Sequence, residues 1–255
     1  NSMKVKYILF LLVCICFSGM AQKIRFASSI GTSYFIWHEN QNTIDLGAQL
    51  TFKLPKKRYQ IYAKLKTLGN AQDALVDRSQ YKFVEPPLSA YNKPLSTNEA
   101  LYAHYRGGEA QLGILWQLPS GLQPIVQLYS KSIARKITSD RTQYIEEEKY
   151  ALHGISLGLQ YEAEMKQSKL VLHAKVFEPL YHDITLYGKY IGIPFSSMTT
   201  NNSISYQTGL EVMVKKFGIS LQYELLNIGA ASNTNSKTIP ASEAKLLSTL
   251  VTYHF

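Results

Sequence analysis

A two-residue alternation near the C-terminal end constrains the fold of this chain more than any other feature. Over residues 244–255, apolar and polar side chains take turns. Because successive side chains of a β-strand point to opposite faces, this segment has one apolar face and one polar face. A barrel in a bilayer turns its apolar face toward lipid, so the pattern predicts a membrane-spanning strand. The apolar parity holds Leu247, Thr249, Val251, Tyr253 and Phe255.

The opposite end has the pattern of a secretory signal peptide. Lys4 and Lys6 flank the start of an apolar run, which small residues follow at 18–21. The run is too short to cross about 30 Å of hydrocarbon as a helix. We therefore expect a signal peptide at 1–21, including two residues ahead of the start methionine, and one barrel domain at 22–255.

Composition narrows the function classes. The net charge of +9 falls to +7 without the signal peptide, which carries two lysines and no acid. The positive charge is spread over turns and strands rather than along one helical face, which argues against nucleic acid as a partner. Cys14 and Cys16 both lie in the expected signal peptide, so the mature chain is expected to have no disulfide and no thiolate metal site. The alternative of a lipoprotein acylated at Cys14 is disfavoured by the bulky Val13.

Period-two alternation recurs along the rest of the chain, and short connections between the segments alternate with long ones. Tight turns on one side and long loops on the other are typical of bacterial outer-membrane barrels. The fold expected is all-β, a single up-and-down antiparallel transmembrane β-barrel of about ten strands, with eight or twelve as alternatives and with long extracellular loops. The expected strands are 24–37, 43–54, 59–67, 109–118, 123–137, 150–162, 169–177, 203–214, 218–227 and 244–255.

A soluble ligand-binding barrel of the calycin kind would show the same alternation. Its apolar face would turn inward around a ligand, and its charged face would be solvated. Strands of about ten residues, matched to a tilted membrane crossing, favour the membrane barrel instead. The soluble barrel remains the alternative architecture.

Two short motifs carry a resemblance. The segment Met20-Ala21-Gln22 and the terminal residues 252–255 resemble those of small outer-membrane β-barrel proteins of Gram-negative bacteria of the Bacteroidota type. The resemblance implies export to the outer membrane, contact with outer-membrane lipids and lipopolysaccharide, and the barrel-assembly machinery as a partner during biogenesis. The residues expected to carry the assembly signal are Leu247, Val251, Tyr253 and Phe255.

The expected interior decides between a channel and a filled barrel. Barrels of about eight strands are filled by side chains, and about ten strands lie close to that limit. Inward positions hold both acids and bases, which need partners away from bulk water. We therefore expect a largely filled lumen, with a narrow channel for small solutes or ions as the alternative. The polar lumen residues expected are Arg25, Asp45, Lys64, Glu109, His173, Glu211 and Glu224.

Two long connections, 68–108 and 178–202, are rich in tyrosine, and the first also in proline. Loops of this length and composition are suited to contact with a protein or a glycan, and a lid folded over the barrel mouth is the alternative. The sequence therefore predicts a surface-exposed binding or complex-forming component of the outer membrane. An enzyme is the less favoured interpretation.

A hydrolase at the barrel rim, either a protease or a lipid A hydrolase, is the third hypothesis. The candidate catalytic residues are His182, Asp183 and His104. Neighbouring residues in a strand point to opposite sides, so His182 and Asp183 do not form a pair by themselves. No metal-ligand or phosphate-binding spacing occurs, and no cofactor is expected.

Overall fold

The computed structural model describes most of the chain. The described residues are 23–53, 58–76, 100–139, 146–188, 195–199, 203–232, 238–239 and 241–255. The expected signal peptide lies outside this set. Within it the regular elements are all β-strands, and no helix is long and apolar enough to cross a membrane.

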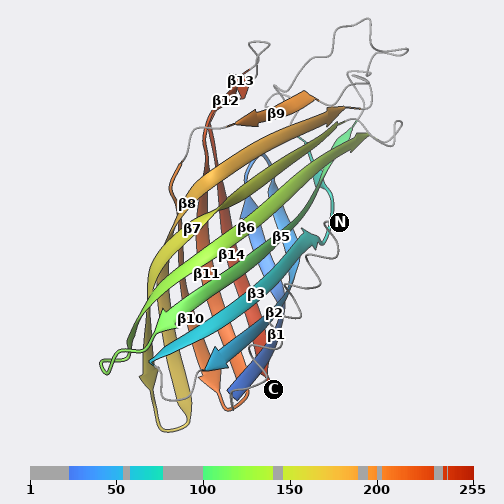
Figure 1. Cartoon of the computed structure of the whole chain (residues 1–255). Helices are drawn as coiled ribbons and strands as arrows, with labels where there is room; N and C mark the ends of the chain where they lie inside the picture. The colour runs from blue at the N-terminus through green and yellow to red at the C-terminus, as the bar shows by residue number, and fades with distance from the viewer. Residues whose placement is uncertain are drawn as a thin grey trace, which may run out of the picture.

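Ten long antiparallel strands close into one barrel (Figure 1). Each strand pairs with its neighbours along the chain, β14 pairs with β1, and β8 pairs directly with β10. The all-β, up-and-down, ten-stranded prediction is therefore confirmed. The strands are β1 (Lys23–Ile36), β2 (Asn40–Lys53), β3 (Tyr59–Asn70), β5 (Leu101–Trp116), β6 (Leu122–Ser139), β7 (Glu146–Glu164), β8 (Ser168–Gly188), β10 (Ser205–Val214), β11 (Phe217–Ile228) and β14 (Ser242–His254).

Four short strands lie at one end of the barrel. β4 (Ala74–Leu75) pairs with β5, β9 (Phe195–Thr199) pairs with β8, and β12 (Ala231–Ser232) pairs with β13 (Thr238–Ile239). At the opposite end, β5 connects to β6, β7 to β8 and β10 to β11 through a few residues each. We call the two the long-loop end and the short-turn end. β1 begins and β14 ends at the short-turn end, where the Phe255 amide donates to the Phe26 carbonyl at 2.9 Å.

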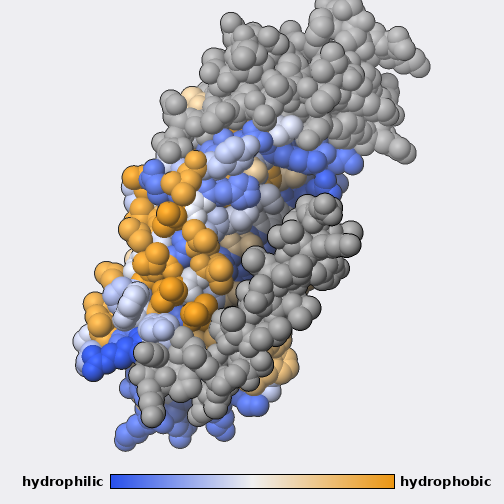
Figure 2. Space-filling model, in the orientation of Figure 1, coloured by the Kyte–Doolittle hydropathy of each residue, from blue (hydrophilic) through white to orange (hydrophobic). Residues whose placement is uncertain are grey.

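The outer surface of the barrel is apolar and the interior is polar. Ile30, Leu46 and Leu157 point outward and are 57%, 52% and 58% exposed, whereas Asp45 points inward and is fully buried. Figure 2 shows such apolar side chains gathered on the visible wall of the barrel. This is the arrangement of a barrel surrounded by lipid, and it excludes the soluble alternative, in which the charged face would lie outside.

The strands β5 to β8 are longer than expected. They have 16, 18, 19 and 21 residues, against 10 in β10 and 12 in β3, and β6 to β8 run on toward the upper right of Figure 1. We call their continuation at the long-loop end the extended sheet; it comprises residues 101–108, 132–139, 146–153 and 181–188.

The extended sheet shows why residues 101–108 and 181–188 are expected to be loops from the sequence. Apart from the buried Arg135, Glu148 and His182, its inner face is apolar, with Tyr105 and Leu152 buried. Its outer face is polar, with Arg106 and Lys149 exposed. The polarity is thus opposite to that of the barrel wall below it, so the alternation sought in the sequence ends where the lipid-facing belt ends. A register shift where His153 meets Tyr181 also changes the parity of β8.

The expected loop boundaries are corrected accordingly. Residues 101–108 and 178–188 belong to β5 and β8, so Tyr102, Tyr105 and Tyr181 are strand residues. The connection between β1 and β2 shrinks to residues 37–39. Much of the first long connection, 77–99, lies outside the described residues.

Glycine at position 113 provides space for the lumen packing. A Cβ atom there would lie 2.7 Å from the Tyr62 ring and 2.8 Å from Gln127 Cβ, whereas a Cβ atom on the outward Gly108 would have its nearest neighbour at 3.6 Å. We therefore expect Gly113→Ala to lower the free energy of unfolding by about 1–3 kcal/mol, because overpacking displaces buried side chains. The measurement is the urea midpoint of the refolded barrel. Gly108→Ala is the matched control, and equal midpoints for the two variants would contradict the packing of this wall.

Candidate functional site

The inward face of β6 gives a section through the whole lumen. Its inward side chains are almost all buried, from the short-turn end to the long-loop end. They cross three zones of the lumen in turn: a polar cavity, a charged layer and an apolar plug. The side chains are, in order, Ile125, Gln127, Tyr129, Lys131, Ile133, Arg135, Ile137 and Ser139.

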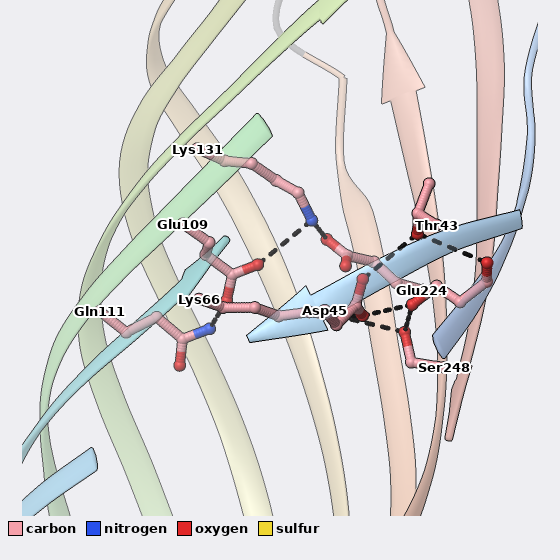
Figure 3. A network of polar contacts seen from close by, with 9 residues as sticks. Thr43, Asp45, Lys66, Glu109, Gln111, Lys131, Glu224 and Ser248 are labelled. Carbon is pink, nitrogen blue, oxygen red and sulfur yellow. Dashed lines mark hydrogen bonds and ion pairs between the residues drawn. The ribbon is translucent and has the colours of Figure 1, made fainter. Parts of the chain in front are cut away.

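The charged layer crosses the middle of the lumen (Figure 3). The ammonium of Lys131 lies 2.5 Å from Glu224 and 3.2 Å from Glu109, and so links β6 to β11 and β5. Gln111 donates a further hydrogen bond to Glu109. All three charged groups are buried, so each carboxylate depends on the lysine in place of water.

A second set of contacts in this layer ties together the strands around the β1–β14 seam. Asp45 lies 2.7 Å from Lys66, accepts a hydrogen bond from Ser33, and accepts another from Thr43 at 3.2 Å. Lys66 also donates to Ser248 at 3.3 Å. The buried carboxylate of Asp45 on β2 therefore has partners from β1, β2 and β3. Lys66 extends these contacts to β14.

The apolar plug fills the lumen at the long-loop end. The Phe35 ring meets Tyr105 edge-on at a centroid distance of 5.1 Å, and Trp37 meets Tyr150 at 4.6 Å. Such edge-to-face pairs add to the stabilisation from burial. The plug comprises Phe35, Leu68, Val76, Leu101, Ala103, Tyr105, Ile133, Ile137, Leu226, Ala244 and Leu246, with Trp37 packed against it.

A buried ion pair lies within the plug. Glu39, from the β1–β2 turn, accepts hydrogen bonds from Arg135 Nε at 3.0 Å and from the Tyr105 hydroxyl at 2.5 Å. Arg135 Nη2 donates to the other oxygen of Glu39, and Nη1 lies 3.6 Å from Glu148. Burial, and then the positive charge of Arg135, lower the pKa of His38 in the same turn to about 4. The contacts of Glu39 therefore hold the β1–β2 turn against the plug. His38 in this turn is neutral at pH 7.

The cavity occupies the lumen at the short-turn end and has a volume of about 170 Å³. Its lining is polar and includes Lys64, Lys175 and His173, together with Glu211. The Tyr62 hydroxyl donates to Gln127 at the inner end of the cavity. The interior therefore has a polar cavity at the short-turn end. The charged layer and the plug fill the lumen between this cavity and the long-loop end.

The fold is similar to that of solved outer-membrane β-barrel proteins of Gram-negative bacteria. The outer membrane protease OmpT from Escherichia coli matches with a TM-score of 0.49 and 9% identity over 92% of this chain and 93% of that one. The translocator domain of the autotransporter NalP from Neisseria meningitidis matches with a TM-score of 0.42 and 9% identity over 99% and 96%. The attachment invasion locus protein Ail of Yersinia pestis matches with a TM-score of 0.40 and 8% identity over 92% and 99%. No protein-family model and no curated protein matches the chain.

The expected lumen residues fall into two of the three zones. The acids on β2, β5 and β11 lie in the charged layer, and the others line the cavity. The first group is Asp45, Glu109 and Glu224, and the second is Arg25, Lys64, His173 and Glu211.

Sequence reasoning missed the ion pair in the plug. Glu39 was expected in a loop, and nothing in its neighbourhood signals that the turn folds inward. Arg135 lies within the expected strand 123–137 and shares the parity of Lys131, so its inward position could have been inferred from parity.

The three candidate catalytic residues do not come together. His182 faces the lumen and is 1% exposed, whereas its neighbour Asp183 lies on the other side of the same strand. His104 is exposed on the outer face of β5 and contacts Asp73 at 2.8 Å. Strands β6 and β7 separate β5 from β8, so no acid–base pair forms among these residues. Within the described part of the chain, no three His, Cys, Asp or Glu side chains are placed to hold a metal ion.

The residues expected to signal assembly lie on the outer face, from Leu247 in the middle of β14 to Phe255 at the short-turn end. Leu247, Val251 and Phe255 are exposed, and the Tyr253 ring packs edge-on between Phe217 at 5.1 Å and Phe255 at 4.8 Å. Their role in assembly stays a prediction.

The charged layer predicts a large effect of removing its lysine. Lys131→Met leaves Glu109 and Glu224 buried without their cation, and we expect the free energy of unfolding to fall by about 3–5 kcal/mol. The measurement is urea unfolding followed by tryptophan fluorescence. Lys149→Met is the control, because this exposed lysine contacts Glu147 at 3.6 Å and its loss should cost less than about 1 kcal/mol. A shift for Lys131→Met no larger than that of the control would show that the layer is not a stabilising centre.

Proposed function

We propose that this protein is a non-conducting outer-membrane barrel that acts as a surface-exposed binding or complex-forming component through its extended sheet. The lipid-facing belt and the closed ring of strands support the membrane location. With the short-turn end in the periplasm, the extended sheet stands outside the cell. Outer-membrane lipids and lipopolysaccharide then contact the belt, and the barrel-assembly machinery reads the outer face of β14 during biogenesis.

The filled lumen supports a role other than conduction. A solute crossing the barrel would have to displace the Lys131 ion pairs and then the rings of the apolar plug. Buried polar groups that lose their partners carry a large free-energy penalty. The channel alternative would require both layers to open together.

The observation that carries the proposal is the reversed polarity of the extended sheet. Its inner face is held by the plug, and its outer face carries paired charges: Arg106 lies 2.8 Å and Lys149 lies 3.6 Å from Glu147. The extended sheet lies beyond the lipid-facing belt, and its polar outer face does not contribute to spanning the bilayer. Held rigidly from behind, it is suited to bind a protein or a glycan, because little ordering entropy is lost on contact.

The first test is electrical. We expect the mature chain, folded in detergent and inserted into a planar bilayer, to show no discrete ohmic steps, because the plug and the charged layer block the lumen in series. Heat-modifiable migration on a gel is the control for folding. Single-channel steps from the folded species would overturn the non-conducting barrel and favour the narrow channel.

The second test addresses the binding surface directly. A photoreactive residue placed at Lys149, on the outer face of the extended sheet, is expected to give discrete cross-linked products in living cells. The same residue at the lipid-facing Leu157 should give none of these products.

Orientation is checked in the same strains with single cysteines, since both natural cysteines lie in the expected signal peptide. Lys149→Cys should react with a membrane-impermeant maleimide on intact cells. Ser120→Cys, in the β5–β6 turn, should react only after the outer membrane is permeabilised. Absence of products from position 149, or labelling in the opposite order, would contradict the proposed function.

A further inference from the structure

The cavity at the short-turn end is too large to be a packing defect. Its volume of about 170 Å³ is more than ten times the roughly 10–15 Å³ that one water molecule requires. It opens at the short-turn end and is closed on the other side by the charged layer. The wall is a continuous ring of paired strands, so a lipid headgroup has no lateral entrance. Any ligand must therefore be a soluble molecule that enters from the short-turn end.

Two lysines on opposite parts of the wall line this cavity without an ion-pair partner. Lys64 comes from β3 and Lys175 from β8, and neither ammonium has a carboxylate within 4.0 Å among the described residues. Lys175 instead contacts the amide oxygens of Gln127 at 3.2 Å and Gln111 at 3.5 Å, and its ammonium lies 6.0 Å from the centre of the Tyr62 ring. Uncharged partners leave its positive charge uncompensated.

The acids around the cavity do not neutralise these lysines. Glu162 is engaged by Lys169 at 2.5 Å, and Glu211 lies 3.8 Å from the Nε2 atom of His254. Glu109, in the layer beyond, is held by Lys131 at 3.2 Å. The cavity lining has four lysine and arginine side chains against two carboxylates, and Arg25 at the mouth also lacks an ion-pair partner among the described residues.

The remaining lining supplies further hydrogen-bond donors. Side-chain amides of Gln49, Gln60 and Gln222 surround the cavity, and the His173 ring lies beside the lysines in its wall. Gly209 allows this placement, because a Cβ atom there would lie 2.4 Å from the His173 ring. Ammonium and amide donors that line one cavity are the groups that hold an oxyanion.

We propose that this cavity is a binding site for a small tetrahedral oxyanion of the phosphate or sulfate class, free or carried by a small soluble molecule. Lys64 and Lys175 supply the charge and the glutamine amides supply further hydrogen bonds. Bound anion would offset the repulsion between the two ammonium groups. The site is independent of the extended sheet, at the other end of the barrel.

The test is a titration of the folded mature protein, in non-ionic detergent, with inorganic phosphate. Sodium chloride holds the ionic strength constant, and binding is followed by the ³¹P linewidth. We expect saturable binding to the wild type and an affinity at least about tenfold lower in the Lys64→Gln/Lys175→Gln double variant, because two charge-assisted hydrogen bonds are lost. Lys216→Gln is the control; it removes one positive charge from the exposed β10–β11 turn, outside the cavity, and should leave the affinity unchanged.

The following results would contradict the proposed anion-binding site. No saturable phosphate binding to the wild type, or an equal loss in Lys216→Gln, would show that only diffuse surface charge attracts the anion. An adventitious ion held elsewhere would bind the double variant as well as the wild type. If the double variant does not fold, the single variants Lys64→Gln and Lys175→Gln replace it, and an unchanged affinity in both would contradict the proposal. The protein is isolated in this experiment, so its failure would leave the cross-linking test of the extended sheet unaffected.

Discussion

The structure depends on closure of the hydrogen-bonded ring. The pairings of β14 with β1 and of β8 with β10 leave no free edge, so the backbone groups of the lipid-facing strands find partners within the sheet. Closure has a cost, because every inward side chain is confined to a narrow space with little water. The ion pairs of Lys131 and Lys66 and the small inward Gly113 are responses to that confinement. The interior is therefore organised by the need to satisfy or exclude charge.

Much of the barrel was predictable because lipid on one side and a polar interior on the other impose a two-residue period. Strand β2 follows that rule over its membrane-spanning part, where Ile44, Leu46 and Leu50 are exposed and Asp45 is buried. The extended sheet was not predictable by the same rule. There the outer face meets water and the inner face meets the plug, so apolar residues such as Tyr105 and Ile184 change sides relative to those of the belt. The bulge opposite His153 then shifts the phase within β8.

The polar interior could be predicted as a set of residues but not as a set of contacts. Parity alone indicates that Lys64, Lys66 and Lys131 face inward, but it cannot say which carboxylate each one meets. That depends on strand tilt and register around the ring, which place Glu224 of β11 opposite Lys131 of β6. The pairing of Glu39 with Arg135 depends in addition on a turn that folds back into the lumen. The register cannot be read from the sequence, so it also could not show that the candidate catalytic residues lie apart. In the structure His104, His182 and Asp183 lie on different faces and strands.

The inward lysines differ in whether a carboxylate lies within ion-pair distance, and this difference distinguishes structural lysines from those proposed to bind a ligand. Lys66 and Lys131 lie in the layer where water is excluded, and each contacts at least one buried carboxylate. Lys64 and Lys175 lie nearer the open end, where solvent reaches the cavity, and have none within ion-pair distance among the described residues. If the cavity served only as filling, its lysines would need the same compensation as those of the charged layer, or apolar replacements. Uncompensated cations are tolerated where an anion from solution can approach them, and the open end of this lumen is the part of the interior that allows it.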